Sequence, residues 1–459
     1  MFMIERRRLR LADGIIGPNT IGHLVPPRQL SHLHFLPGVE QLDALKLSSR
    51  TTMIEPHTFG NAHLPSYRYV MAAVVLILTF SFGLSWFAVA PVTPLIMDEF
   101  NINRSTASLL ISLIALTHLI LGIPSSVLVS RIGPKKAITA GAVLGSFPVL
   151  SFLTMDYSLL LLTRIVLGAG IALIFTAMGP LAMQWFSARE LPLFNGLWAA
   201  SMALGMAVSS FLIVPLSDIL GWKLGLSIFG GISVIGGMCW VVLSPNLQTS
   251  GKELQKFPIK DTVQVMKSRN TLLIAAADAG PYALLAATAA WLPTFYHEVQ
   301  GMSLVKAGSL MGILALSGTC SLIATSFLML WITHRRIMLI IPGIIVGFAG
   351  LGSFLLAGTP LVYLAVAALG ATAFMYLPTL LTIPMELPGT DPLKVAVIFG
   401  TLMSVGSAAT MLSPFIVGFT TDLLDSYVPS LTLFSVLAWS LPIAGILLPE
   451  TGPTAKPES

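Results

Sequence analysis

The chain has 459 residues, of which 55% are hydrophobic and only 10% are charged, and its mean hydropathy is +0.86. About a quarter of the residues in a soluble domain are charged. This composition therefore excludes an ordinary soluble fold and predicts a protein embedded in a lipid bilayer. The two cysteines, Cys239 and Cys320, lie in separate apolar stretches, so we expect packing thiols rather than a disulfide or a metal site.

Residues 1–66 differ in kind from the rest of the chain. They contain a basic cluster between Arg6 and Arg10 and scattered prolines, with no helical or strand period. We predict a disordered basic cytoplasmic tail, which could contact anionic lipid. No apolar stretch long enough for a secretory signal follows the cluster. An alternative is that translation starts at Met53 or Met71.

Apolar stretches of about 20 residues, the length that a helix needs to cross a bilayer, recur from Tyr69 onward. We predict an all-α membrane protein with twelve transmembrane helices, near residues 69–96, 106–130, 137–154, 158–184, 195–217, 223–243, 271–296, 306–332, 337–357, 361–384, 395–419 and 430–448. The longest polar interruption separates six helices from six. The predicted domains are a tail (1–66), a six-helix bundle (67–243), a cytoplasmic linker (244–270), a second six-helix bundle (271–449) and a short cytoplasmic tail (450–459).

The basic residues predict the orientation of these helices. If the amino terminus is cytoplasmic, the outer loops contain only Arg104, Lys223 and Lys306 of the 25 lysines and arginines. Cytoplasmic loops carry an excess of Lys and Arg. We therefore expect both termini on the cytoplasmic side of a cytoplasmic membrane.

The two halves of the sequence are related by a constant offset. A shift of 204 residues superposes Arg131 on Arg335, Pro180 on Pro384, Gly196 on Gly400, Ser209 on Ser413, Phe211 on Phe415 and Asp218 on Asp422. A shared register over several helices indicates a duplicated six-helix unit, and such repeats place a binding site at their interface near the membrane midplane.

Local patterns add a family resemblance. The loop after the second predicted helix, SVLVSRIGPKK, has Arg131, Gly133 and Lys135 at the spacing of a GxLaDRxGRK motif. The fourth predicted helix contains Arg164, Gly168 and Gly170 in an RxxxGxG pattern. With the layout of six plus six helices, these patterns resemble the major facilitator superfamily from Tyr69 to Pro449.

The resemblance implies secondary transport by rocking of two bundles, with the loop motif controlling the conformation and the two glycines packing helices. Ser130 replaces the aspartate that latches the two halves in the family, which puts that latch in doubt. Ser209-Ser210 replaces the Gly-Pro pair of the antiporter motif, which weakens a proton-antiport interpretation. Stretches from Asn195 and Met385 are similar to the cyanate and nitroimidazole transporter branch, although the first helix lacks that branch's arginine.

Arg164 and Asp278 are the charged residues that lie deepest in the predicted helices. An ionisable group in the hydrocarbon is costly, which makes both functional candidates. At 1.5 Å per residue, their depths differ by about 10 Å, so we expect no direct ion pair. In the functional interpretation, Arg164 holds an anionic solute and Asp278 titrates as the coupling group. In the structural alternative, Arg164 braces its helix and Asp278 bonds the backbone.

Further candidates for the solute and coupling site are His118, which can change charge near neutral pH, and the aromatic residues Trp86, Tyr282, Trp291 and Tyr376. In the resembled family, the helices that carry these aromatic residues line the cavity. For each residue taken alone, packing between helices is the alternative. Pro281 frees the carbonyl of Ala277, which predicts a bend beside Asp278.

Other chemistry finds little support in the sequence. It contains no phosphate-binding loop, no HExxH or CxxC pattern and no acidic pair with metal-ligand spacing inside a helix. We therefore expect no enzyme, cofactor, metal or nucleic-acid partner. The predicted function is secondary transport of a small, anionic organic solute by a monomer, with protons as a candidate coupling ion. The alternatives are export of hydrophobic compounds and a non-transporting receptor or scaffold on the same fold.

Overall fold

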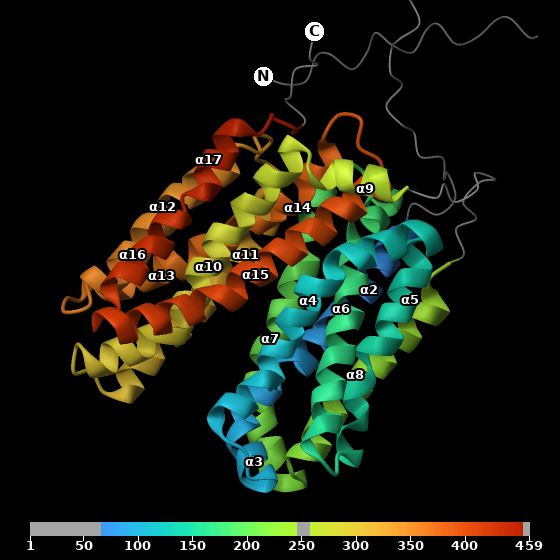
Figure 1. The fold of residues 1–459 in the computed structure, drawn as a ribbon. Helices are drawn as coiled ribbons and strands as arrows, with labels where there is room; N and C mark the ends of the chain where they lie inside the picture. Colours follow the sequence, from blue (N-terminus) through green and yellow to red (C-terminus); the bar gives the residue numbers. More distant parts are fainter. Residues whose placement is uncertain (1–65, 246–257, 453–459) are drawn as a thin grey trace, which may run out of the picture. The chain divides into compact units, whose positions relative to one another are not determined.

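The computed structural model describes residues 66–245 and 258–452, and every regular element in these ranges is a helix. Twelve segments are long and apolar enough to cross a membrane. They form two bundles of six (Figure 1), which confirms the predicted fold class. The predicted tail up to residue 65, residues 246–257 of the predicted linker and residues 453–459 lie outside the described ranges.

The first bundle contains six spans, two of which are interrupted. Its elements are α2 (Tyr67–Phe87) with α3 (Val89–Phe100), α4 (Arg104–Ile132), α5 (Pro134–Gly145) with η1 (Phe147–Leu153), α6 (Tyr157–Trp185), α7 (Leu191–Leu220) and α8 (Trp222–Leu243). The interruption at Ser146 precedes Pro148, which cannot donate a backbone hydrogen bond within a helix.

The second bundle begins with a short helix, α9 (Ile259–Met266), that packs on α10 and α15. Its spans are α10 (Arg269–Glu298), α11 (Leu304–Leu328), α12 (Ile337–Leu355), α13 (Leu361–Met375) with α14 (Leu377–Glu386), α15 (Pro392–Leu424), and α16 (Val428–Leu437) with α17 (Ser440–Leu447). The fourth of these spans breaks at Tyr376, before Pro378. In contrast, α10 continues through Pro281 without interruption.

Side-chain caps fix where several helices begin. The side-chain oxygens of Asn103, Asp156, Ser268, Ser303 and Asp391 each accept a hydrogen bond from a backbone N–H of the first turn. Such a cap satisfies a donor that the helix itself leaves free. Asp391 and the following Pro392 start α15 three residues before the predicted boundary, and α15 ends at Leu424 rather than near residue 419.

The bundles share one apolar core and also have separate ones. We call the half of the spans nearest Tyr67 and Leu447 the terminal half, and the other the far half. In the terminal half, one buried cluster joins residues of both bundles, such as Leu181 of α6 and Phe399 of α15. In the far half, each bundle has a core of its own, around Ile96 in the first and Leu310 in the second.

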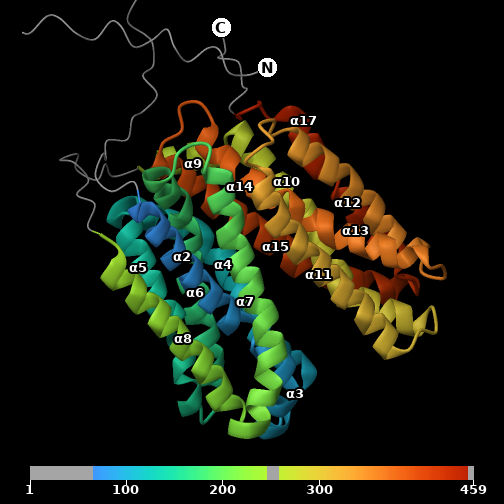
Figure 2. The same ribbon diagram turned by 180° about the vertical axis from the view of Figure 1, so that it is seen from behind.

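Contacts between the bundles involve a few helices. Helices α4, α6 and α7 of the first bundle meet α11, α14 and α15 of the second, and these helices lie on the facing sides of the bundles in both views (Figures 1 and 2). Glycines allow the closest approach, because a Cβ on Gly122 of α4 would lie 2.7 Å from the carbonyl oxygen of Gly400 on α15.

Candidate functional site

Arg164 is fully buried in the first bundle. It lies two turns into α6, and its side chain is 0% exposed. One guanidinium nitrogen, Nη1, donates to the backbone carbonyl of Ser85 on α2 at 2.8 Å, whereas Nε and Nη2 have no hydrogen-bond partner within residues 66–245 and 258–452. A buried guanidinium with unused donors is energetically costly. None of the residues that the structure describes therefore supplies Arg164 with a negatively charged partner.

Ser85 is held from two sides. Its carbonyl accepts from Arg164, and its hydroxyl lies 3.1 Å from the hydroxyl of Ser233 on α8. Ser233 in turn donates to the carbonyl of Ser81, one turn earlier on α2. The first span is interrupted at Ala88, just beyond this network. The contacts of Arg164 are thus compatible with the bracing role as well as with a binding role.

His118 and Trp86 lie together in the same bundle. The imidazole of His118 on α4 meets the indole of Trp86 edge to face, with ring centroids 5.2 Å apart. His118 is 3% exposed, and its Nε2 has no hydrogen-bond partner in the described part of the chain. Since Trp86 follows Ser85 directly, the two predicted residues Arg164 and His118 contact consecutive residues of α2.

Asp278 and Tyr376 form a hydrogen-bonded pair in the second bundle. The hydroxyl of Tyr376 donates to Oδ1 of Asp278 at 3.1 Å. Asp278 is 5% exposed, and Gly406 of α15 leaves room for its carboxylate, since a Cβ there would lie 2.9 Å from Oδ2. Tyr282 is one helical turn beyond Asp278 on α10. Tyr376 is the residue at which the fourth span of the second bundle is interrupted.

The structure thus divides the candidate residues between the bundles. Arg164 and Asp278 bind different partners on different bundles, the carbonyl of Ser85 and the hydroxyl of Tyr376. Trp291 lies apart from both groups, toward the far end of α10. Its indole N–H donates to the carbonyl of Pro414, and its ring lies 5.8 Å from that of Tyr427.

The predicted loop motif lies at the terminal end of α4 and α5. Gly133 has a φ of +81°, a conformation that favours glycine, and it caps the end of α4. Lys135 donates to the carbonyl of Ser244 at the end of α8, at 2.5 Å. Arg131 is exposed. Ser130 is buried and donates to the carbonyl of Val127 in its own helix.

The counterpart of this loop in the second bundle contains a buried ion pair that the sequence analysis missed. Arg335, the residue that the 204-residue offset superposes on Arg131, donates from Nε and Nη2 to the carboxylate of Glu386, with distances of 2.8 to 3.3 Å. Both side chains are nearly buried. Glu450 accepts from the backbone N–H groups of Arg335 and Arg336. This cluster ties the end of α14 to the segment before α12.

Breaking the buried pair should destabilise the protein strongly. We expect Arg335→Ala to lower the free energy of unfolding by about 3–5 kcal/mol, because it leaves Glu386 buried without a partner. Arg336→Ala is the matched control and should cost only about 1 kcal/mol, since Arg336 is half-buried and donates to backbone carbonyls. Denaturant unfolding in detergent measures both. Equal losses for the two variants would contradict a special role for the pair.

The two glycines of the RxxxGxG pattern differ in how tightly they pack. A Cβ on Gly170 would lie 2.5 Å from the backbone nitrogen of Gly145 and 2.6 Å from the carbonyl oxygen of Gly141. A Cβ on Gly168 would meet only the side chain of Thr117, at 3.0 Å or more. Gly170 therefore allows α6 and α5 to touch through their backbones.

We expect Gly170→Ala to destabilise the protein by about 1–3 kcal/mol, because backbone atoms must move apart. Gly168→Ala should cost less, since a side chain can adjust. Gly231→Ala is the control, because nothing lies within 4 Å of its added Cβ. We expect the lowest thermal melting midpoint for Gly170→Ala, an intermediate one for Gly168→Ala and the highest for Gly231→Ala. A Gly170→Ala protein as stable as the control would contradict this packing.

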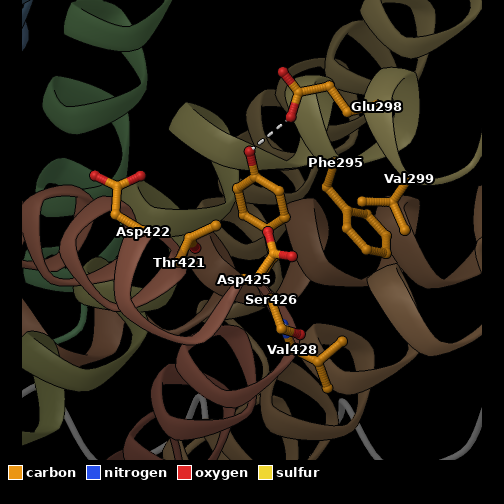
Figure 3. A pocket seen from close by; sticks show the side chains of 9 residues that line it. Phe295, Glu298, Val299, Thr421, Asp422, Asp425, Ser426 and Val428 are labelled. Atoms are coloured by element: carbon orange, nitrogen blue, oxygen red, sulfur yellow. Dashed lines mark hydrogen bonds between the residues drawn. The ribbon is translucent and has the colours of Figure 1, made fainter.

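A pocket of about 570 Å³ lies at the far end of the second bundle, between the ends of α10 and α15 and the start of α16 (Figure 3). Three carboxylates line it, those of Glu298, Asp422 and Asp425. Tyr427 donates to Glu298 at 3.0 Å, and burial together with this bond raises the pKa of Tyr427 to about 12. The pocket is acidic and would repel an anion. Asp278 does not line it.

The twelve spans, arranged as two bundles of six with buried ionisable groups inside them, define a multi-pass membrane protein of the secondary-transporter type. The sequence profile described as "Major Facilitator Superfamily" matches residues 75–414. The chain therefore belongs to the major facilitator superfamily, whose members bind small solutes in the bilayer. This confirms the predicted family.

Solved structures agree with this assignment at the level of the fold. The transporter FucP in its outward conformation superposes with a TM-score of 0.70 at 15% sequence identity, over 83% of this chain and 99% of FucP. The human organic anion transporter MFSD10 superposes with a TM-score of 0.65 at 12% identity, over 82% and 99% of the two chains.

Relatives known by sequence cover shorter stretches. An uncharacterised protein of Campylobacter jejuni, Cj0987c, is 28% identical over 48% of this chain and 69% of its own length. The uncharacterised transporter YfhI of Bacillus subtilis is 31% identical over 40% of this chain and 46% of its own length. The probable nitrate transporter NarT of Staphylococcus haemolyticus is 30% identical over 30% of this chain and 36% of its own length.

Proposed function

We propose that the protein is a secondary transporter that moves a small anionic solute by alternating access, with Arg164 as the anion-binding residue and Asp278 as a proton-coupling residue. The solute passes between the two bundles. The protein works as a monomer in a cytoplasmic membrane, with both termini on the cytoplasmic side. The two bundles, 67–243 and 271–449, are its moving units.

The unused donors of Arg164 carry the proposal. Acidic residues of the first bundle lie near the ends of its spans, namely Asp98, Glu99, Asp156, Glu190 and Asp218. None of the ion pairs among the described residues includes Arg164. An anionic solute would supply the missing charge and accept from Nε and Nη2. The printed description of NarT as a probable nitrate transporter also supports an anion.

Access to Arg164 requires a change of conformation, because the side chain is 0% exposed. The interruption of the first span at Ala88 supports such a change, since it lies directly beyond the contacts of Ser85 and Trp86. Helix α3 can then move relative to α2 without breaking a continuous helix. The solute would reach Arg164 and His118 from the far half, where the bundles have separate cores.

The surroundings of Asp278 suit a group that gains and loses a proton. A tyrosine hydroxyl can donate to a carboxylate and can accept from a carboxylic acid. The hydrogen bond between Tyr376 and Asp278 can therefore persist in both protonation states.

The arrangement of the cores supports alternating access. The bundles share an apolar core in the terminal half and have separate cores in the far half, which corresponds to a state that faces away from the termini. The positive charges of the terminal-side loops support a cytoplasmic terminal side. The far side is then the outer one.

The purified protein in proteoliposomes tests the proposal. With a pH-sensitive dye inside and an imposed proton gradient, we add small carboxylates and inorganic oxyanions, including nitrate, one at a time. We expect at least one anion to accelerate proton movement, whereas a neutral sugar such as fucose has no effect. Acceleration by lipophilic cations alone would reject the anion assignment and favour an exporter of hydrophobic compounds.

A further inference from the structure

The interface between the bundles in the terminal half contains a buried amide. Asn195, one turn after the start of α7, is 0% exposed. Its Nδ2 donates to the hydroxyl of Thr382 at 2.9 Å and lies 3.6 Å from the sulfur of Met385, both on α14 of the other bundle. Its Oδ1 accepts from the indole N–H of Trp198 on its own helix. Both polar atoms of the amide therefore have partners only when the two bundles are in contact.

The residues around this hydrogen bond allow a close approach. A Cβ on Gly196 would lie 2.0 Å from the hydroxyl of Ser326 on α11, so α7 reaches this depth only because residue 196 is glycine. The hydroxyl of Thr382 donates to the carbonyl of Pro378, which orients its lone pairs toward Asn195. The acceptor is thus fixed in place before the amide arrives.

The hydrogen bond between Asn195 and Thr382 is neutral, and it lies on other helices than Ser130. The sequence has Ser130 where the family has a latching aspartate, and the Ser130 hydroxyl donates to the carbonyl of Val127 in its own helix. We propose that Asn195 and Thr382 are positioning residues that form a neutral latch, which holds the terminal half closed while the far half is open. The inference rests on the alternating-access cycle proposed above.

A neutral latch suits a contact that must open in every cycle. When the bundles separate, water can replace the hydrogen-bond partners of Asn195 and Thr382. The hydrogen bond therefore favours the closed terminal half over the open one by only a small free energy. A hydrogen bond of this kind shifts an equilibrium by about 2- to 10-fold. The latch also lies on the same ten-residue helix, α14, that starts beside Tyr376, the partner of Asp278. Separation of the bundles at Thr382 and a change in the protonation of Asp278 therefore both act on helix α14.

A reporter cysteine measures the opening. In the full chain with Cys239 and Cys320 replaced by alanine, we introduce Val395→Cys, which is 0% exposed and faces Gly179 of the other bundle. Its thiol can react with a membrane-impermeant maleimide added on the terminal side only when the bundles separate there. Asn195→Ala and Thr382→Val should each speed labelling by about 2- to 10-fold.

Thr372→Val is the matched control, because Thr372 is also buried in the fourth span of the second bundle and donates only to its own helix, at Ala368. It should leave the labelling rate unchanged. The double variant Asn195→Ala/Thr382→Val should label no faster than the faster single variant, since both remove one bond. The nearly isosteric Thr382→Val keeps the test valid if Asn195→Ala reduces folding.

The outcomes separate the latch from the transport cycle. Measurable labelling at the same rate in wild type, Asn195→Ala and Thr382→Val would overturn the latch and leave alternating access intact. An equal acceleration by Thr372→Val would overturn it as well. A reporter that never reacts in any variant would contradict alternating access itself, and the latch with it.

Discussion

Arg164→Ala is expected to lower transport per folded molecule by about 30-fold or more, because removing one member of a buried, hydrogen-bonded charge pair costs about 2–5 kcal/mol. In the proposed site, the anionic solute is the partner of Arg164 in this charge pair. Arg164→Lys should weaken the apparent affinity less, since lysine keeps the charge but not the planar fork of donors. Uptake in proteoliposomes, divided by the amount of folded protein from size-exclusion chromatography, measures both effects.

A purely structural role of Arg164 predicts a different result. If Arg164 only holds the carbonyl of Ser85, its replacement lowers abundance and melting temperature, and transport falls only in proportion. Ser233→Ala is the matched control, because it breaks the other side of the same network and leaves Arg164 in place. It should reduce stability and spare transport per molecule. A wild-type rate per molecule for Arg164→Ala would exclude Arg164 from the binding site.

The sequence predicted the spans well, because their signal is local and strong. Each predicted helix has a counterpart in the structure, and most boundaries agree within a few residues. The start of α15 was predicted too late, although Asp391 followed by Pro392 is a recognisable helix start. The interruptions at Ala88 and Tyr376 were not predicted, because an apolar stretch looks the same whether its helix is continuous or broken.

The candidate residues were predicted as a set, without their pairing. Hydropathy and charge single out Arg164 and Asp278, but which side chains meet them depends on the packing of distant helices. Tyr376 is 98 residues from Asp278 in the sequence. The ion pair of Arg335 with Glu386 was missed for the same reason, since a carboxylate at the end of a span is expected to be solvated.

Asn195 was missed for a related reason. The predicted span began at this residue, where an asparagine is expected to face water at a helix end. The helix instead begins at Leu191 with Pro192 in its first turn, which places the amide within the helix and against the other bundle. An error of one turn at a boundary thus moved a polar residue from the surface to an interface.

Asp278→Asn should abolish accumulation of the solute against its gradient while solute exchange continues. The amide has nearly the shape of the carboxylate and can still bond the hydroxyl of Tyr376, but it cannot carry a proton. The bundles can therefore still rock with solute bound. Internal solute should rise only until the two sides are equal, whatever proton gradient is imposed.

Two controls make this result specific to the proton. Asp422→Asn removes an exposed carboxylate from the far end of the same bundle and should leave accumulation unchanged. Tyr376→Phe removes the hydrogen bond but keeps the carboxyl group, so coupling should persist with an altered pH dependence. If Asp278→Asn accumulates solute like the wild type, Asp278 carries no coupling proton. If Asp278→Asn instead loses exchange and accumulation together while remaining folded, the carboxylate acts on the solute or on the bundles, and the coupling group lies elsewhere.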